Sequence, residues 1–564
     1  MIKEISKLIA NYASEIPEET IASLIEIPPN STMGDYALPC FPLAKIYHKN
    51  PTNIAEDIKQ YIDSANIPFI DKTEVFNGYL NIFVQRNYYI KIVLEQIMNE
   101  TYISRSIGRN QTICIDYSSP NIAKNFHVGH LRTTVIGNSL YKIYEKLGYK
   151  VVRINHLGDW GTQFGKLILA YKNWSSREKV EKEGINELLR IYILFHKEAK
   201  DNPKLNEEAR SWFLKMEQGD EEALNIWDWF KEISMIQFNH IYQLLGVEFD
   251  SFTGESFYMD KVSAVVKELT HKNLLEESQG AKIVNLDKYN MAPCLITKSD
   301  GSSIYPSRDL AAILYRKKTF HFTKCLYVTG LEQKLHFAQV FKVIDMMGYD
   351  WSNGLIHIPY GLVSISGEKL STRSGNIVYA EELLKEAILR AEKAIETRNP
   401  NLQNKEKTAK MVGIGAIIFH DLFHQRIKNI DFSWDEVLSF EGSTGPYVQY
   451  TYARAKSILR KNPDYVSSLD IDFSPLNEDT SFQLVKKLND YPKAVLYAAD
   501  SYEPSIIARY VIGLAQEFNK FYHNCSIINS EYKIRLARLC LVFAAQKVMK
   551  EAMELLGIQC PEEM

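Results

Sequence analysis

The sequence predicts a multidomain protein in which a small α+β domain, an α/β domain with a parallel sheet and an all-helical bundle follow one another. At 564 residues the chain is too long for one compact core, because domains usually contain ~100 to 200 residues. A strand, helix, strand pattern over residues 112–154 is typical of a parallel sheet. Helical periodicity dominates beyond about residue 405. We expect domains at residues 1–107, 108–405 and 406–564.

The N-terminal region has the pattern of a small mixed domain. Apolar residues recur with helical spacing over 2–12 and again over 54–61. A strand-like run follows through residues 79–84. We expect this region to fold as a separate domain.

The next region begins with an apolar strand over 112–117, which ends at the turn-forming residues Ser118 to Asn121. The pattern then turns helical from about Gly129 to Lys146, and Gly148 closes the helix. Residues 151–154 supply another strand. This order is the building block of a parallel sheet.

A helical insertion interrupts this α/β region at about residues 174–250, where two amphipathic stretches follow one another. Strands resume over 282–286, 294–305, 324–329 and 355–358. Beyond residue 405 we expect helices, with loops at Asn462-Pro463 and Ser474-Pro475.

Composition limits the possible partners and locations. Lys plus Arg total 66 against 69 for Asp plus Glu, a formal net charge of -3, so no bulk positive field indicates a nucleic-acid binder. The acidic start lacks a signal-peptide core, and no run of ~18 apolar residues predicts a membrane span. We expect a cytoplasmic protein. The seven cysteines form no CxxC pair, so we expect reduced thiols, no structural zinc and no metal site.

A candidate phosphate-binding site lies where the predicted strand ends and the predicted helix begins. His127 and His130 stand three residues apart and face one way, with Gly129 between them. A helix N-terminus offers free N–H groups and partial positive charge, and each imidazole can donate to a phosphate oxygen. The pair alone is also compatible with ordinary histidines at a helix start.

Two longer segments sharpen this interpretation. Residues 118–130 read SSPNIAKNFHVGH and residues 368–375 read EKLSTRSG. These segments resemble the paired signatures of class I aminoacyl-tRNA synthetases, and SPNIAK before HVGH is specific to the arginyl-tRNA synthetases. The resemblance extends over nearly the whole chain, through GDYALPCFPLAK, NHLGDWGTQFG, YPSRDLAA, STGPYVQYTYAR and the terminal GIQCPEEM.

The resemblance implies a Rossmann-like catalytic domain split by an insertion, an N-terminal domain that contacts the tRNA outer corner, and a C-terminal anticodon-binding domain. It implies that L-arginine attacks ATP, supplied with Mg²⁺, and that the arginyl group then passes to tRNA(Arg). Members of the family are usually monomers.

By the same resemblance, His127 and His130 stabilise the transition state and Lys369 reaches the phosphates. The implied ATP site also includes Gly129, Ser371, Arg373 and His336, although His336 is equally compatible with an ordinary packed histidine. The loop signature usually carries a second lysine, where this chain has Thr372. The candidate replacements are Lys124, which we favour, and Arg373.

For the amino acid, the resemblance implies that Tyr305 and Asp309 clamp the guanidinium, because this group needs acceptors. An acid in a first helical turn also complements the helix dipole without any ligand. Asp116 and Asn121 would hold the amino and carboxylate end, and Gln333 would line the pocket. Asp116 is also compatible with a buried strand end that backbone N–H groups satisfy.

In the N-terminal domain, Tyr79 and Asn81 resemble the family segment that contacts a tRNA base. An exposed aromatic beside an amide is a reasonable base platform. Tyr79 is equally compatible with a strand residue packed inward.

Two rival functions are considered. A different nucleotidyltransferase explains the two histidines but not the remaining chain. A non-catalytic RNA-binding or regulatory protein on a synthetase scaffold would be favoured by loss of His127, His130 or Lys369, and all three are present.

Overall fold

The computed structural model describes residues 1–298, 304–365, 368–369, 379–463 and 470–564. These residues form two compact units. The first unit comprises Met1–Tyr102, Ala455–Tyr491 and Leu514–Val548, and the second comprises Ile103–Arg454, Pro492–Gly513 and Met549–Met564.

The first unit contains an antiparallel sheet of three strands in the order β1-β3-β2. Its strands are β1 (Tyr36–Pro39), β2 (Ile70–Phe76) and β3 (Tyr79–Val84), and its N-terminal helices are α1 (Ile2–Tyr12), α2 (Glu18–Leu24), α3 (Phe41–Tyr47), α4 (Pro51–Ser64) and α5 (Arg86–Met98). Asn77 and Gly78 connect β2 to β3 with φ of 48° and 79°. Positive φ at both residues is typical of a tight type I′ hairpin, for which Asn-Gly is preferred.

Within the first unit, α5 packs against α19 (Asp479–Asn489) through an arginine and a tyrosine. The Arg86 guanidinium pairs with Asp479 at 2.8 Å and lies over the Phe482 ring, 4.7 Å from its centroid. Tyr89 contacts the same ring edge-on at 5.6 Å. Residues far apart in the sequence therefore share one hydrophobic contact.

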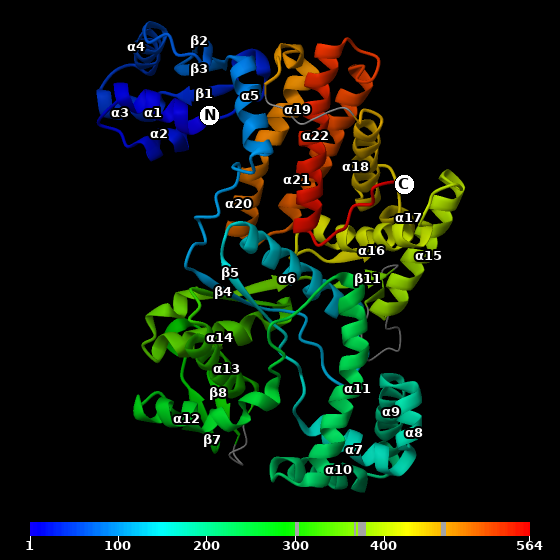
Figure 1. Ribbon diagram of the computed structural model, residues 1–564. Coiled ribbons are helices and arrows are strands. Elements are labelled where there is room, and N and C mark those ends of the chain that lie inside the picture. The colour runs from blue at the N-terminus through cyan, green and yellow to red at the C-terminus, as the bar shows by residue number, and fades with distance from the viewer. Residues whose placement is uncertain (299–303, 366–367, 370–378, 464–469) are drawn as a thin grey trace. The chain divides into compact units, whose positions relative to one another are not determined.

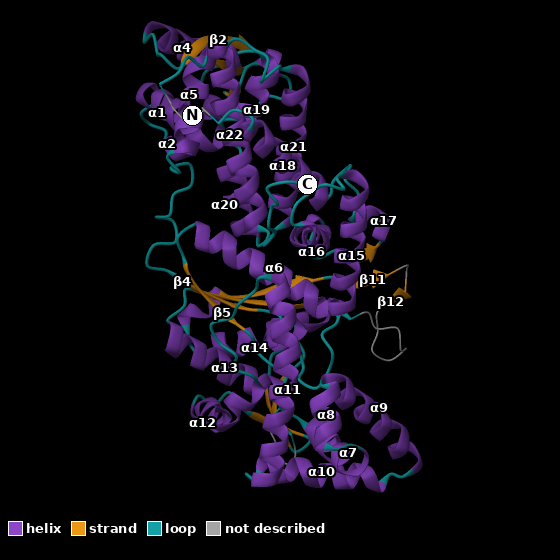
Figure 2. Cartoon of the chain, turned by 45° about the vertical axis from the view of Figure 1, so that its right-hand side comes forward, coloured by secondary structure: helices purple, strands orange, loops and turns teal. Residues whose placement is uncertain are grey.

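The second unit is built around a parallel sheet in the order β10-β9-β4-β5 (Figures 1 and 2). Its strands are β4 (Thr112–Asp116), β5 (Lys150–Ile154), β9 (Lys324–Gly330) and β10 (Leu355–Tyr360). Helix α6 (Val128–Lys146) covers one face, and α13 (Tyr305–Phe320) and α14 (Lys334–Met346) cover the other. This arrangement follows from right-handed crossovers that leave the centre of the sheet in opposite directions.

Between β5 and β9 the chain forms the helical insertion and a small antiparallel sheet. The helices are α7 (Thr162–Trp174), α8 (Arg177–Glu183), α9 (Ile185–Asp201), α10 (Lys204–Glu217), α11 (Glu221–Leu245) and α12 (Val262–His271), and the strands are β6 (Glu276–Ser278), β7 (Ala281–Val284) and β8 (Cys294–Thr297). The helices begin at Thr162, earlier than the sequence pattern predicted. The expected turn at Asp300-Gly301 lies outside the described residues.

A third sheet of the second unit joins β11 (Val363–Ile365) to β12 (Glu368–Lys369) and to β13 (Ile430–Phe432). Strand β13 pairs in parallel with β11, which corrects the expectation of an almost wholly helical region beyond residue 405. The remaining helices are α15 (Ala380–Arg398), α16 (Lys405–Phe423), α17 (Trp434–Val437), α18 (Gly445–Arg460), α20 (Tyr491–Ser501), α21 (Ser505–Asn524) and α22 (Tyr532–Leu555). Helices α18, α20, α21 and α22 contain residues of both units.

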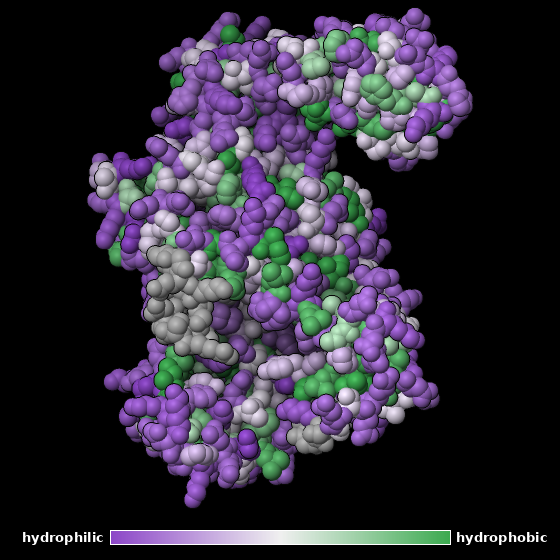
Figure 3. All heavy atoms as spheres, turned by 180° about the vertical axis from the view of Figure 1, so that it is seen from behind, coloured by the Kyte–Doolittle hydropathy of each residue, from purple (hydrophilic) through white to green (hydrophobic). Residues whose placement is uncertain are grey.

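On the face shown in Figure 3, hydrophilic residues cover most of the surface and hydrophobic ones form small separate groups. Scattered exposed apolar side chains are normal for a soluble protein. Six of the cysteines are buried free thiols and Cys560 is partly buried.

Candidate active site

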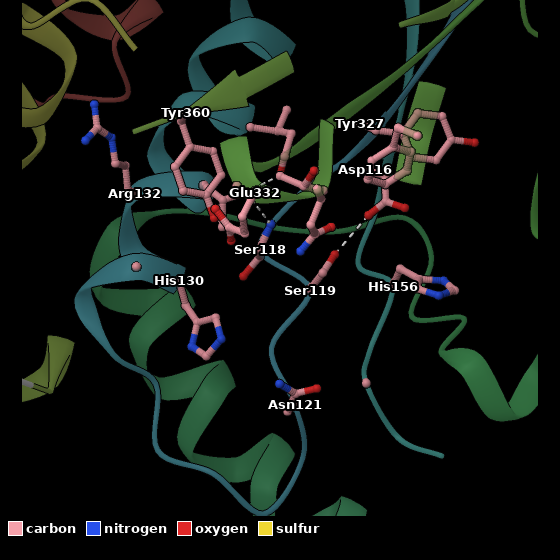
Figure 4. Close-up of a pocket in the computed structure, with 18 of the residues that line it drawn as sticks. Asp116, Ser118, Ser119, Asn121, His130, Arg132, His156, Tyr327, Glu332 and Tyr360 are labelled. Atoms are coloured by element: carbon pink, nitrogen blue, oxygen red, sulfur yellow. Dashed lines mark hydrogen bonds between the residues drawn. The ribbon is translucent and has the colours of Figure 1, made fainter. Parts of the chain in front are cut away.

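A cavity of about 580 Å³ lies at the carboxyl ends of β4 and β9. These strands are neighbours in the sheet, and the chain continues from β4 to β5 on one side and from β9 to β10 on the other. Such a switch point leaves a crevice in which substrates bind. Figure 4 shows Asp116, Ser119, Asn121 and His130 around the cavity, at the end of β4, on the segment that follows it and at the start of α6.

The two histidines at the start of α6 are held by its cap. The His127 Nδ1 atom accepts from the Gly129 N–H at 3.0 Å, and the His127 N–H donates to His130 Nδ1 at 3.4 Å. The two rings stack with centroids 3.7 Å apart. Because each Nδ1 accepts, the proton of each neutral ring sits on Nε2. Both imidazoles therefore offer an Nε2–H donor.

These rings are neutral at pH 7. Burial lowers the pKa of His127 to about 4, and the positive charge of Lys124 acts in the same direction. Burial, followed by His127 and Lys124, holds the pKa of His130 well below its ordinary value. A neutral Nε2–H donor fits a group that must stabilise charge developing on a ligand.

The loop before α6 is shaped by contacts with α11 of the insertion. Ser118 and Ser119 have φ of 71° and 44°, which residues other than glycine seldom adopt. The Ser118 hydroxyl lies 2.8 Å from the Tyr242 hydroxyl, and the Ala123 N–H donates to Ser234 Oγ at 2.8 Å. These contacts with α11 hold the loop in its strained backbone conformation.

Asp309 carries a negative charge into the cavity. Burial alone would raise the pKa of this carboxyl group, but the hydrogen bond from His336 Nε2, 2.6 Å long, and neighbouring positive charges outweigh burial and lower it. Asp309 is therefore ionised at neutral pH. It is a suitable acceptor for a cationic group.

Asp116 is already paired with a cation. The Arg316 Nη2 atom lies 2.8 Å from the Asp116 carboxylate, and the Arg316 side chain is 1% exposed. The Ser119 hydroxyl donates to the same carboxylate at 2.9 Å. A ligand amino group would therefore meet a carboxylate whose charge is largely balanced.

A third acid, Glu255, faces the same cavity. It begins a 3-10 helix (Glu255–Lys261) and pairs with Arg308. Burial raises the pKa of Glu255 to about 8, although Arg308 opposes this shift. The Arg308 guanidinium also lies 4.8 Å from the centroid of the Tyr305 ring, which is 59% exposed.

Three family models match the chain over nearly its whole length. Residues 93–434 match the model described as tRNA synthetases class I (R), catalytic domain. Residues 448–564 match the DALR anticodon binding domain, and residues 3–84 match the Arginyl tRNA synthetase N terminal domain. The chain belongs to the arginyl-tRNA synthetase family.

Individual relatives agree with this assignment. The arginine–tRNA ligase of Alkaliphilus metalliredigens is 50% identical over 564 residues, which is 100% of this chain and 99% of its own. The arginine–tRNA ligase of Clostridioides difficile is 48% identical over 562 residues, 99% of each chain. The arginyl-tRNA synthetase structure from Plasmodium falciparum has a TM-score of 0.80 at 26% identity and covers 100% of this chain and 98% of its own. That from Thermus thermophilus has a TM-score of 0.84 at 24% identity, with 100% of both chains covered. The predicted family and fold class are confirmed.

In this arginyl-tRNA synthetase chain, most of the predicted site residues meet at one cavity. Those that line it are Asp116, Asn121, His127, Gly129, His130, Tyr305, Asp309, Gln333 and His336. Lys124 is partly buried beside the histidines rather than in this lining. The backbone of Lys369 lies in β12. Ser371, Thr372 and Arg373 lie outside the described residues.

The two predicted tRNA-contacting residues of this synthetase lie in β3 of the first unit. Asn81 is 6% exposed. Tyr79 is partly buried, and its ring meets the Phe41 ring edge-on at 5.3 Å. Tyr79 is therefore the more accessible of the pair.

Three charged residues at or beside the cavity were not predicted from the sequence: Arg316, Arg308 and Glu255. Arg316 stands seven residues after Asp309 on α13, which is two helical turns and hence the same face, so helical spacing carried a signal. Arg308 follows the motif residue Ser307 directly. Nothing in the sequence around Glu255 indicates that the fold brings it to Arg308.

Within the described part of the chain, no group of three or more His, Cys, Asp and Glu side chains is arranged to hold a metal ion. Over the same residues, no helix is both long enough and apolar enough to cross a membrane.

Proposed function

We propose that this chain is an arginine–tRNA ligase. It joins L-arginine to ATP as arginyl-adenylate with release of pyrophosphate, and then transfers the arginyl group to the 3′-terminal adenosine of tRNA(Arg) with release of AMP. The observation that carries this proposal is one cavity that is lined both by two neutral histidines at a helix N-terminus and by the ionised Asp309. Family membership supplies the reaction class.

In the activation step, a carboxylate oxygen of arginine bonds to the α-phosphorus of ATP while the bond to the pyrophosphate oxygen breaks. The reaction needs no protein nucleophile, so catalysis rests on positioning and charge stabilisation. His127 and His130 donate to the phosphate oxygens as their charge increases, and Gly129 leaves room for close approach. Added to Gly129, a Cβ atom would lie 2.9 Å from the His127 ring. Lys369, Ser371, Arg373 and His336 complete the proposed ATP site, and Mg²⁺ enters with ATP.

Arginine binds with its guanidinium between Asp309 and Tyr305 and with its amino and carboxylate end near Asn121 and Asp116. Gln333 lines the pocket beside them. The lowered pKa of Asp309 supports this orientation, because an ionised carboxylate matches the planar guanidinium fork. The Arg316 partner of Asp116 favours a role for Asp116 in orientation rather than as a free counter-ion.

We propose a separate role for each of the three predicted domains. Residues 1–107 contact the tRNA outer corner, with Tyr79 and Asn81 at a base, and residues 406–564 bind the anticodon. Residues 108–405, with the insertion at about 174–250, form the catalytic domain. We propose a cytoplasmic monomer without structural zinc.

Lys124 is the proposed substitute for the lysine missing at Thr372. We expect Lys124→Ala to lower kcat by ~10², because leaving pyrophosphate accumulates negative charge near the helix terminus. Adding Thr372→Lys should restore part of the rate, since both ammonium groups would address the same phosphates. The measurement is steady-state aminoacylation with tRNA binding as the control. A fully active Lys124→Ala enzyme would transfer the role to Arg373, and an inactive enzyme without rescue would show that the loop cannot reach the position of Lys124.

The proposed function is tested by exchange of labelled pyrophosphate into ATP by the purified chain. Exchange should require arginine and be fast only when tRNA is present, because members of this family generally need tRNA for activation. Complete lack of exchange with intact tRNA binding would favour the non-catalytic RNA-binding alternative.

A further inference from the structure

One arginine beside the signature histidines has no assigned role. Arg132 lies on α6, two residues after His130, and its side chain is 0% exposed. A fully buried guanidinium is costly unless its donors are satisfied, so such a residue indicates a specific structural or functional demand. Figure 4 shows Arg132 next to the cavity and on the same helix as His130.

The partners of Arg132 are backbone carbonyls. Its Nη1 donates to the Leu362 carbonyl at 3.1 Å, and its Nη2 donates to the Arg426 and Lys428 carbonyls at 3.1 and 2.9 Å. Asp421 is 3.6 Å from Nε and makes no hydrogen bond to it, so it does not fix the geometry of the guanidinium. Both terminal nitrogens are committed to backbone, which disfavours direct contact of Arg132 with a phosphate.

The carbonyls that Arg132 binds belong to the segments that start β11 and β13. Leu362 immediately precedes β11, and its carbonyl also accepts from the Ile430 N–H of β13 at 2.9 Å. The Gly361 N–H donates to the Arg426 carbonyl at 2.8 Å. A Cβ atom on Gly361 would lie 2.6 Å from the Lys428 carbonyl oxygen, so the two segments are in close contact. Arg132 thus anchors a junction with little freedom to shift.

That junction holds β11, whose partner strand β12 carries Lys369. Strand β11 pairs antiparallel with β12, where Ser364 is the partner of Lys369 and Ile365 the partner of Glu368. The path from the histidines to the backbone of Lys369 therefore runs through α6, Arg132, Leu362 and the pairing of β11 with β12.

A second arginine, Arg426, also holds this segment in place. The Arg426 side chain donates from Nη1 to the Pro359 carbonyl at 2.7 Å and from Nε to the Tyr502 carbonyl at 3.0 Å. Pro359 lies in β10 of the parallel sheet. The carbonyl that Arg132 binds on Arg426 is thereby fixed to the sheet whose end forms the cavity.

We infer that Arg132 is a positioning residue for the activation step: it fixes the ribbon of β11 and β12, and the Lys369 backbone with it, relative to His127 and His130. The inference rests on the proposed function, in which these three residues address one ATP. Because a misplacement of ~1 Å can cost ~10² in rate, a rigid link between the two groups has a direct catalytic value. In the proposed function, arginine binds at Asp309 and Asp116. We therefore expect its affinity not to depend on the contacts of Arg132.

The test compares Arg132→Met, Arg132→Lys and the control Ser139→Ala. Ser139 lies on the same helix, and its buried hydroxyl donates to the Leu555 carbonyl at 2.8 Å, away from β11. We expect Arg132→Met to lower kcat for pyrophosphate exchange by ~10² with the arginine KM within about two-fold of wild type. Arg132→Lys keeps the positive charge but not the planar guanidinium with its paired donors. We expect this variant to lower kcat for pyrophosphate exchange by ~10-fold. Ser139→Ala should keep kcat within about three-fold.

Hydrogen exchange of backbone amides supplies an independent readout on the same proteins. In Arg132→Met the amides of Gly361 and Ile430 should exchange faster, whereas those of β4 and β5 should keep their protection. The inference is overturned by wild-type kcat in both Arg132 variants, by a loss confined to the arginine KM, or by unchanged protection at Gly361 and Ile430. If Arg132→Met fails to fold, Arg132→Lys decides by the same criteria. Lack of exchange activity in the wild type would instead refute the proposed function, while amide protection would still test the anchor.

Discussion

Replacing His127 or His130 with alanine is expected to lower kcat for aminoacylation by ~10² or more while leaving the arginine KM nearly unchanged. Each imidazole presents an Nε2–H donor because its Nδ1 accepts a backbone N–H, and each is neutral at pH 7. These donors interact most strongly with charge that develops in the transition state. Steady-state aminoacylation at saturating tRNA measures both constants.

The role of His127 as helix cap needs its own control. Alanine at this position also removes the acceptor for the Gly129 N–H, which costs ~1 kcal/mol of stability. His127→Asn restores a good capping residue without the imidazole. The asparagine variant should unfold near the wild-type denaturant midpoint, yet its kcat for aminoacylation should remain low. A raised arginine KM at unchanged kcat in these variants would show that the histidines bind the amino acid instead.

Asp309→Asn is expected to abolish most arginine activity and to narrow the preference for arginine over citrulline, which is isosteric but uncharged. A site built around paired hydrogen bonds discriminates by ~10⁴ in favourable cases, because the analogue leaves buried polar groups unmatched. Competition between the two amino acids in pyrophosphate exchange measures the preference. The matched control is Asp345→Asn on α14, an acid that pairs with Lys342 at 2.8 Å. Wild-type discrimination in Asp309→Asn would place the guanidinium pocket elsewhere.

Elements with strong local patterns were predictable. Helix α1 spans the residues that its apolar spacing indicated, and β4 and α6 begin within one residue of their expected starts. Strand β13 was not predicted, because three residues carry too little periodicity and its partner β11 is distant in the sequence. The early start of the insertion at α7 follows an N-cap glycine, Gly161, with φ of 142°, which the sequence alone does not mark as a helix start.

The site residues likewise divide into those that a local motif marks and those that only the fold brings together. His127 and Asp309 were identified because they stand in HVGH and YPSRD, two of the segments that carry the family resemblance. Arg132 was not, because a lone arginine on a helix usually indicates a solvated face, and only the fold brings Leu362 and Lys428 to it. Helical spacing indicated that Arg316 shares a face with Asp309, but only the fold pairs Arg316 with Asp116. Buried charge pairs between distant segments are the part of a site that sequence patterns reveal least.

The central claim is that this cavity activates arginine, and tRNA-dependent pyrophosphate exchange tests it most directly. The purified chain is assayed with ATP, Mg²⁺ and labelled pyrophosphate, with arginine, lysine or citrulline, and with or without tRNA(Arg). The account predicts fast exchange with arginine and tRNA together and little with any other combination. Exchange at full rate without tRNA, or equal exchange with lysine, would contradict it.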